Sequence, residues 1–313
     1  MRLPLAAIVG PTAVGKSAVA VEVADRLNGE IVSADSMQVY RQMDIGTAKI
    51  SADEMIATGG RLIPHHLINV VSPDEDYSVA RYQQDARTLI REVNSRNELP
   101  ILVGGTGLYV QSVIDPYHFG KEPGDKNIRN KIRTKIKIEG LDKIHQELRE
   151  VDPQAGEKIH PNDEKRIIRA LEYYYSRGER ISDNYYKKKI SLYNLAMVGL
   201  TMDRQLLYQR INKRVDKMIE AGLLDEVRML LNQGYPRNLP AMQGLGYKQM
   251  AAFCVGDLSW DEAIRVLKRD TRRFAKRQLT WFRRDERIVW IDVSHMAEDD
   301  IICKITEYIC RTL

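Results

Sequence analysis

The segment Gly10-Pro11-Thr12-Ala13-Val14-Gly15-Lys16-Ser17 matches the phosphate-binding pattern G-x-x-x-x-G-K-[ST], which is typical of one class of α/β fold. The apolar run from Leu5 to Val9 precedes it and is typical of a strand buried on both faces. From Ser17 to Leu27, apolar residues recur at three- to four-residue spacing, which predicts a helix. A strand, a glycine-rich turn and a helix in this order indicate a phosphate loop, or P-loop.

The P-loop predicts a site for a diphosphate group. Its main-chain N–H groups form an anion nest, and the helix that follows adds its positive N-terminal end. Lys16 supplies a positive charge, and the Ser17 hydroxyl is a candidate ligand for Mg²⁺. The alternative is a glycine-rich turn that matches by chance, which the flanking strand and helix argue against. The expected diphosphate-binding residues are Gly10, Pro11, Thr12, Ala13, Val14, Gly15, Lys16 and Ser17.

Strand and helix patterns alternate along the first hundred residues and predict a parallel sheet with right-handed crossovers. After the P-loop helix, the expected elements are strands at Glu30–Ala34 and His66–Val71, a helix at Ser78–Asn97, and strands at Leu99–Val103, Tyr193–Leu200 and Arg287–Val293. We therefore predict an α/β fold of the P-loop nucleoside-triphosphate-hydrolase-like type, with flanking helices and a helical insertion.

The length of 313 residues corresponds to about two domains. A Pro- and Gly-rich break at 115–127 is followed by helical patterns over Ile128–Arg149 and Asn162–Arg177. We therefore expect a helical insertion domain at 121–190. The remaining segments, 1–120 and 191–313, would form the P-loop core with a C-terminal helical part.

Composition excludes several classes of protein. Hydrophobic residues make up 43% and charged residues 29%, ordinary values for a folded globular chain. The longest apolar runs are too short for a bilayer span, and no secretory signal is visible. Three cysteines without a CxxC pair argue against a disulfide scaffold or a zinc finger. We expect a cytoplasmic protein with no membrane partner.

Positive charge is concentrated in the second part of the chain. The net charge is +5, and the densest basic stretches are Arg265–Arg284 and Lys126–Lys137. Such asymmetry suggests that the second part binds a polyanion. The alternative is a set of solvated helix faces.

Two further strand ends carry candidate functional residues. Asp35 follows the strand at Glu30–Ala34, at the edge of the sheet where α/β proteins build their sites. Its carboxylate is a candidate Mg²⁺ ligand or general base, and the alternative is a turn residue. The strand at Leu99–Val103 ends in Gly-Gly-Thr-Gly, which allows close approach to a ligand and places the Thr106 hydroxyl there.

With these segments in place, the chain resembles a known family, the bacterial-type tRNA dimethylallyltransferases, also called tRNA isopentenyltransferases or IPP transferases. The matching segments are Gly-Pro-Thr-Ala-Val-Gly-Lys-Ser at 10–17, Asp-Ser-Met-Gln-Val-Tyr at 35–40, Met-Asp-Ile-Gly-Thr-Ala-Lys at 43–49, Gly-Gly-Thr-Gly-Leu-Tyr at 104–109, His-Pro-Asn-Asp at 160–163, Gly-Leu-Leu-Asp-Glu-Val at 222–227, Gly-Leu-Gly-Tyr-Lys-Gln at 244–249 and Lys-Arg-Gln-Leu-Thr-Trp-Phe-Arg at 276–283. The resemblance covers essentially the whole chain.

The resemblance implies a reaction and its catalytic residues. A dimethylallyl group would pass from dimethylallyl diphosphate to N6 of the adenosine next to the anticodon, on its 3′ side, in tRNAs that read codons beginning with U. Diphosphate leaves, and Mg²⁺ assists. Asp35 matches the family's general base and Arg214 its catalytic arginine. Thr106 matches a residue near the bridging oxygen and the substrate base, and Lys16 would stabilise the leaving group.

The resemblance also implies which segments contact tRNA, with the anticodon stem-loop as partner. The tRNA-binding residues expected from it are Asp35, Ser36, Met37, Gln38, Thr106, Arg129, Lys165, Arg166, Arg169, Met242, Gln243, Gly244, Gly246, Tyr247, Lys276, Arg277, Gln278, Trp281 and Arg283. Trp281, Phe282 and Tyr247 are candidates for stacking on splayed bases, and helix core is the alternative for Trp281 and Phe282. A monomer is expected, because one chain with two lobes can grip one stem-loop.

Three other functions are consistent with parts of the sequence. A nucleotide or small-molecule kinase would need a nucleobase pocket for ATP and would leave the C-terminal basic surface without use. An RNA-binding adaptor with a vestigial P-loop is disfavoured by the intact Lys16, Ser17 and Asp35. A chain without the helical insertion would favour a prenyltransferase that acts on free adenine nucleotides. This chain has the insertion, so that function is disfavoured.

Overall fold

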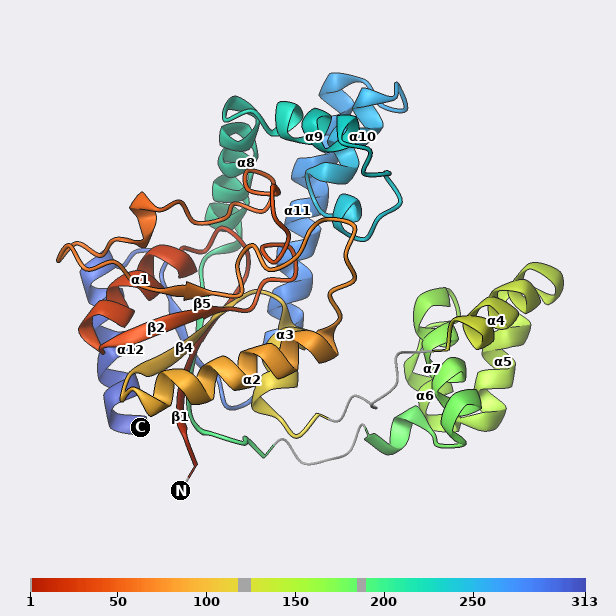
Figure 1. Cartoon of the computed structure of the whole chain (residues 1–313), viewed down its shortest axis with the longest axis horizontal. Helices are drawn as coiled ribbons and strands as arrows, with labels where there is room; N and C mark the ends of the chain where they lie inside the picture. Colours follow the sequence, from red (N-terminus) through yellow and green to blue (C-terminus); the bar gives the residue numbers. More distant parts are fainter. Residues whose placement is uncertain (1, 118–124, 185–189) are drawn as a thin grey trace. The chain divides into compact units, whose positions relative to one another are not determined.

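The computed structural model describes residues 2–117, 125–184 and 190–313, and Figure 1 shows the arrangement of their elements. The chain divides into two compact units. The sheet unit comprises Met1–Tyr117 and Ser191–Leu313, and the helical unit comprises His118–Ile190. The expected Pro- and Gly-rich break lies partly outside the described residues, at 118–124.

The sheet unit is built on six parallel strands in the order β3-β2-β4-β1-β5-β6. The strands are β1 (Pro4–Val9), β2 (Gly29–Ser33), β3 (His65–His66), β4 (Leu99–Gly104), β5 (Asn194–Thr201) and β6 (Val289–Asp292). In the register of the central strands, Ala6 of β1 lies between Ile101 of β4 and Ala196 of β5. This arrangement confirms the α/β parallel-sheet prediction.

Helices cover both faces of the sheet, which explains the continuous apolar run in β1. Leu5 and Ala7 pack on the layer formed by α2 (Val79–Ser95) and α3 (Gly107–Ile114). The alternate residues, Ala6 and Ile8, pack on the opposite layer, formed by α1 (Lys16–Arg26) and α12 (Glu298–Thr312). The carboxyl ends of the strands remain available for a site.

The third strand is much shorter than the sequence predicts. The expected strand at His66–Val71 is wrong beyond its first residue, because the ladder stops at His66. Leu67 and Asn69 adopt left-handed conformations, with φ of 61° and 56°, which an extended strand does not accommodate. Val71 instead forms an isolated parallel bridge with Tyr40.

Four helices of the C-terminal part belong to the sheet unit and share its larger hydrophobic core. They are α8 (Arg204–Glu220), α9 (Leu223–Asn232), α10 (Tyr247–Cys254) and α11 (Trp260–Phe282). The long helices α8 and α11 pack against each other (Figure 1). Short 3₁₀ turns lie at η1 (Asp53–Met55) and η3 (Ala241–Gln243). This arrangement brings α8 and α11 to the P-loop end of the sheet.

The helical unit has its own small core, in which Ile144, Leu148 and Ile167 are buried. Its elements are α4 (Lys126–Glu139), α5 (Leu141–Val151), α6 (Pro153–Lys158), α7 (Glu164–Arg177) and η2 (Ile181–Asn184). The expected continuous helix at Ile128–Arg149 is two helices, because Gly140 between them has a φ of 88° that ends the first.

The sheet unit is closed at the point where the chain leaves and re-enters it. The N–H of Leu192 donates to the carbonyl of Ile114 at 2.9 Å. Nearby, the Arg87 guanidinium donates to the Asp115 carbonyl at 2.7 Å, and Arg287 donates to the Asp115 carboxylate at 2.6 Å. The two edges of the insertion point are therefore fixed by bonds within the sheet unit. Across the described residues, no helix is both long and apolar enough to cross a membrane.

Candidate active site

The P-loop connects β1 to α1 at the centre of the sheet. Gly15 precedes α1 with a φ of 104°, and Ala13 also has a positive φ, of 65°. A loop with positive φ angles before the start of a helix is typical of an anion nest, and the helix dipole favours an anion there. The Lys16 ammonium folds back and donates to the Pro11 carbonyl at 2.7 Å. The loop therefore has the geometry of a diphosphate cradle.

Asp35 and Thr106 follow β2 and β4 and lie near one another. Asp35 accepts the N–H of Met37 at 2.9 Å through Oδ1. The Thr106 hydroxyl oxygen accepts the N–H of Ser36 at 3.1 Å, and its hydroxyl donates to the Ser36 hydroxyl at 3.3 Å. The segment that carries Asp35 is thus tied to the glycine-rich turn after β4, as expected for neighbouring strand ends.

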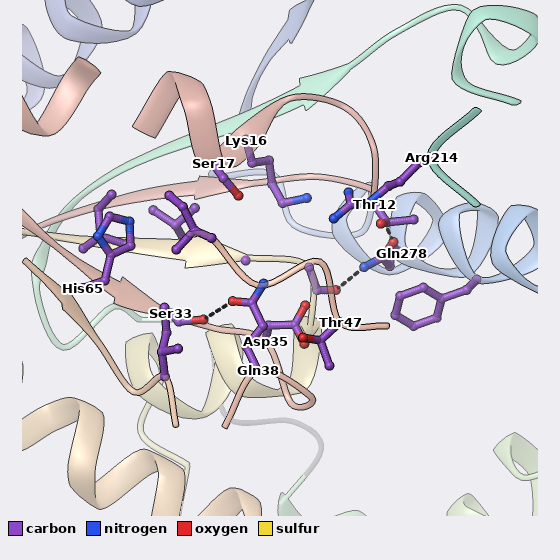
Figure 2. A pocket seen from close by; sticks show the side chains of 17 residues that line it. Thr12, Lys16, Ser17, Ser33, Asp35, Gln38, Thr47, His65, Arg214 and Gln278 are labelled. Atoms are coloured by element: carbon purple, nitrogen blue, oxygen red, sulfur yellow. Dashed lines mark hydrogen bonds between the residues drawn. The ribbon is translucent and has the colours of Figure 1, made fainter. Parts of the chain in front are cut away.

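Three charged side chains converge at this edge: Lys16, Arg214 of α8 and Asp35. Burial and the positive charge of Arg214 lower the pKa of Lys16 to about 7, and Asp35 opposes that shift. Burial also lowers the pKa of Arg214, again opposed by Asp35. Figure 2 shows Lys16 and Arg214 reaching into the same space. Two cations beside one carboxylate suit a site that binds a polyanion.

These side chains line a cavity of about 80 Å³, drawn in Figure 2. Besides the charged groups, its walls include Thr12, Ser17 and Gln278. A wider cavity of about 750 Å³ shares Lys16, Ser17 and Arg214 with it.

A third cavity, of about 340 Å³, shares Thr12, Asp35 and Arg214 with the small one. Its other walls include predicted tRNA-binding residues: Ser36, Met37, Thr106, Gln243, Gly244, Tyr247 and Arg277. Arg214 lines all three cavities. The small cavity therefore shares residues with both wider cavities. One of these lies at the P-loop, and the other is lined by the segments after β2 and before α10.

The chemistry of the site fits Mg²⁺ held mainly by a bound diphosphate. Ser17 offers a hydroxyl oxygen at the P-loop side, and oxygen ligands are those that Mg²⁺ prefers. Across the described residues, no cluster of three or more His, Cys, Asp or Glu side chains is placed to hold a metal ion. A cation here would depend on Ser17, substrate oxygens and water.

Two of the five predicted contacts at residues 242–247 have buried side chains. Tyr247 is fully buried and donates its hydroxyl to Glu226 at 2.6 Å. Met242 is fully buried as well. In this structure Tyr247 is not placed to stack on a base, because its ring forms part of the core. Gly244 and Gln243 line the 340 Å³ cavity and remain accessible candidates.

Helix α11 separates its predicted contacts onto two faces. Lys276, Arg277 and Arg283 are exposed. Phe282 is buried in the core, so the alternative of helix core applies to it, and Trp281 packs against the same core. The next predicted contact, Gln278, is only 6% exposed and bonds to two loops of the site. The exposed face carries Lys276 and Arg277, and the exposed Arg283 follows the end of the helix.

In the helical unit, the predicted contacts gather on α4 and α7. Arg129 donates to both carboxylate oxygens of Glu172, at 2.9 and 3.1 Å, and Arg169 donates to the same carboxylate at 3.3 Å. Glu172 is only 1% exposed, so it holds both guanidiniums from the inside. Lys165 and Arg166 are exposed at the start of α7. The four cations thus belong to two adjoining helices of this unit.

Sequence reasoning assigned no role to three residues at the site. Thr47 lines the small cavity and the 340 Å³ cavity, and Phe274 of α11 lines both as well. Glu226 of α9 accepts the N–H groups of residues 44, 45 and 46, at 2.9, 2.8 and 3.1 Å. A signal was available for two of them, because Thr47 and Glu226 lie in segments that match the resembled family.

The parallel sheet, the P-loop after β1 and the cavities beside it are those of a P-loop α/β protein, and Lys16 and Arg214 line these cavities. The family model described as "IPP transferase" matches residues 38–285. The chain belongs to the IPP transferase family, as the sequence motifs predicted.

Curated relatives match over nearly their whole length. A tRNA dimethylallyltransferase of Carboxydothermus hydrogenoformans is 54% identical over 95% of this chain and 94% of its own. A tRNA dimethylallyltransferase of Moorella thermoacetica is 51% identical over 99% of this chain and 96% of its own.

Solved structures match as well. The full-length tRNA isopentenylpyrophosphate transferase of Bacillus halodurans is 46% identical, with a TM-score of 0.74, covering 99% of this chain and 96% of that one. A eukaryotic dimethylallyltransferase acting on tRNA is 28% identical, with a TM-score of 0.82, covering 99% of this chain and 80% of that one. The P-loop α/β fold is therefore that of its family.

Proposed function

We propose that this protein transfers a dimethylallyl group from dimethylallyl diphosphate to tRNA, releasing diphosphate. The acceptor atom is N6 of the adenosine on the 3′ side of the anticodon, in tRNAs that read codons beginning with U. One observation carries the proposal: Arg214 lines three cavities. The first is the 750 Å³ cavity at the P-loop, the second is the 340 Å³ cavity lined by Ser36 and Thr106, and the third is the 80 Å³ cavity that shares lining residues with both. Two substrates approaching from these cavities would meet beside Asp35.

The P-loop side suits the donor. A diphosphate would lie against the loop N–H groups and the start of α1, beside Lys16 and Arg214. Negative charge on the diphosphate grows as the bond to the five-carbon group breaks, so two fixed cations stabilise the transition state more than the ground state. Mg²⁺, held by Ser17 and the diphosphate oxygens, would supply further neutralisation of that charge.

The opposite side suits the acceptor. The adenine N6 would attack carbon C1 of the dimethylallyl group, the C1–O bond would break, and diphosphate would leave. The attacking amine would lose one proton, which Asp35 accepts through its carboxylate. Thr106 is held by Ser36 beside this carboxylate and would orient the base or the bridging oxygen.

The acceptor base must leave the anticodon loop to reach this position. An adenine stacked in a loop cannot enter a cavity of about 340 Å³ with its neighbours, so we propose that it is flipped out. The exposed cations of α11, and separately those of α4 and α7 in the helical unit, would hold the phosphates of the stem-loop. A tRNA substrate implies a cytoplasmic enzyme, and we propose a monomer.

Acceptor choice tests the proposal directly. Purified protein is incubated with Mg²⁺, radiolabelled dimethylallyl diphosphate and tRNA, AMP or ATP in separate reactions. Label transferred to tRNA, and located on N6 of the expected adenosine after nuclease digestion, supports the proposal. Label on AMP or ATP, or hydrolysis of ATP coupled to turnover, would contradict it and favour a free-nucleotide prenyltransferase or a kinase.

A further inference from the structure

Gln278 lies on the opposite face of α11 from the helix's exposed cations. It is 6% exposed, whereas its neighbours Lys276 and Arg277 are exposed. A side chain buried in this way is poorly placed to contact tRNA. Its environment assigns it another task, because it lines the small cavity where the two wider cavities meet.

The Gln278 amide bridges two loops of the site. Its Oε1 accepts the N–H of Thr12 in the P-loop at 2.9 Å. Its Nε2 donates to the carbonyl of Gly105, in the turn after β4, at 3.0 Å. An amide side chain offers an uncharged acceptor and an uncharged donor on one planar group, so the two partners fix its orientation.

The turn after β4 is shaped to receive this amide. A Cβ atom at Gly105 would overlap Nε2 of Gln278, so only glycine allows this approach. The bridge joins loops that lie 266 and 173 residues away from Gln278 in sequence. It therefore sets the separation of the loops that follow β1 and β4.

The bridge also changes which groups of the P-loop face the ligand. Because the Thr12 N–H already donates to Gln278, it is not free to donate to a diphosphate. The N–H groups nearer α1 and the Lys16 ammonium are left to hold the anion. The P-loop is thus tied to α11 through Gln278, and a loop that is already held in place loses less conformational freedom on binding.

We propose that Gln278 is a positioning residue for the donor site and does not bind tRNA. It holds the P-loop and the Gly105 turn at the spacing that a diphosphate requires. This inference rests on the proposed function for the identity of the donor, but the diphosphate site itself is independent of the acceptor.

Two substitutions test the assignment. Gln278→Glu keeps an acceptor for Thr12 but replaces the donor to Gly105 with a carboxylate oxygen that repels its carbonyl. Gln278→Met has similar length and removes both bonds. We expect Gln278→Met to raise the Kd of inorganic diphosphate, measured by titration calorimetry in Mg²⁺, by about tenfold or more, as for the removal of buried hydrogen bonds. Gln278→Glu should raise this Kd further, because its carboxylate also repels the anion. The KM for dimethylallyl diphosphate should rise in parallel.

The affinity for tRNA separates this role from a tRNA contact. We expect the tRNA Kd of both variants, measured by filter binding, to stay within about twofold of the unsubstituted protein. Lys276→Ala is the matched control on the same helix, and the opposite pattern is expected for it: weaker tRNA binding with unchanged diphosphate binding. If Gln278→Met does not fold, Gln278→Leu decides, since it also removes both bonds and adds no charge to the anion site.

Two results would overturn the inference: unchanged diphosphate affinity in a folded Gln278→Met or Gln278→Leu protein, or a loss of tRNA affinity alone. Failure of the proposed function would look different. The unsubstituted protein would then bind inorganic diphosphate, and lose that binding in the variants, yet transfer no dimethylallyl group to tRNA.

Discussion

The Lys16 ammonium donates to the carbonyl of Pro11, five residues before it in the same loop, at 2.7 Å. The lysine that should meet the diphosphate is therefore turned onto its own main chain. Burial and Arg214 lower its pKa to about 7, so near neutral pH this side chain is only partly charged. The ammonium has two further N–H groups that can donate to a diphosphate, and a bound anion would favour its charged form.

This relationship predicts that diphosphate binding takes up a proton. A bound anion favours the charged ammonium and raises its pKa above about 7, so between that value and the raised pKa the complex holds more protons than the free protein. Affinity should therefore fall as pH rises through this window. Calorimetry at pH 8 in buffers of different ionisation enthalpy measures the uptake.

Lys16→Met serves as the control for that titration, because it removes the titrating group without adding another. Its uptake should drop to the level contributed by the ligand itself. Equal proton uptake by the variant and the unsubstituted protein would show that Lys16 does not titrate on binding.

Asp35→Asn should separate base catalysis from structure. The Oδ1 atom accepts the N–H of Met37, and an asparagine retains that acceptor while losing the ability to take a proton. We expect kcat to fall by a factor of about 10² to 10⁴, with tRNA affinity nearly unchanged. Single-turnover transfer with saturating substrates measures the loss. Near-normal turnover in this variant would rule out the general-base role.

Glu226 should control the order of the loop over residues 44–50. Its carboxylate accepts three consecutive main-chain N–H groups and the Tyr247 hydroxyl, and the loop includes Thr47 and Ile50, which line the small cavity. Glu226→Gln removes the charge and places an amide N–H donor opposite main-chain N–H donors. Each main-chain N–H left unpaired should destabilise the loop by about 1–3 kcal/mol. Hydrogen exchange at residues 44–46 should accelerate by about tenfold or more.

Asp225→Asn is the matched control for that substitution. Asp225 is the preceding residue of α9, is exposed, and pairs only loosely with Arg228, at 3.6 Å. Its exchange profile should remain that of the unsubstituted protein. If residues 44–46 of the Glu226→Gln protein exchanged as slowly as those of the control, the carboxylate would not be what holds the loop.

The exposed cations of α11 should set the salt dependence of tRNA binding. If Lys276 and Arg283 each neutralise one phosphate, replacing either with alanine should reduce the slope of log K against log salt by about 0.7 to 0.9. Lys304→Ala, which removes an exposed charge from α12 instead, should leave the slope unchanged. Affinities measured across a salt series decide the matter, and slopes equal to the unsubstituted protein would mark residues 276 and 283 as solvated surface.

The local parts of the site could be predicted from sequence because each is encoded within a few residues. The P-loop pattern marks β1, the loop and α1 together, and it places Lys16 and Ser17 at the cavity. Asp35 and Thr106 follow buried strands, and parallel strands bring their carboxyl ends to one edge. These inferences needed only strand periodicity and the direction of the strands.

The remaining features depend on contacts between distant segments. Leu67 and Asn69 adopt left-handed conformations although neither is glycine, the residue that usually marks such positions. The early end of β3 could therefore not be predicted from the sequence. Tyr247 was predicted to stack on a base because its neighbours in sequence do not indicate burial. Its burial depends on Glu226 and on core residues that are distant in sequence. Gln278 lies within a basic run, and its neighbours in sequence led to the prediction that it binds RNA. In the structure it lies between two loops and bonds to both.

The hydrogen bond from Leu192 to Ile114 has a consequence for the modular history of the chain. Because the edges of the insertion point are already joined within the sheet unit, the intervening segment is a cassette that can be exchanged without remaking the sheet. A chain in which a short glycine-serine linker replaces 118–190 should keep all six strands and bind diphosphate. The RNA contacts made by the helical unit could thus change in evolution while the reaction site of the sheet unit stayed the same, since selection would act on the two units separately.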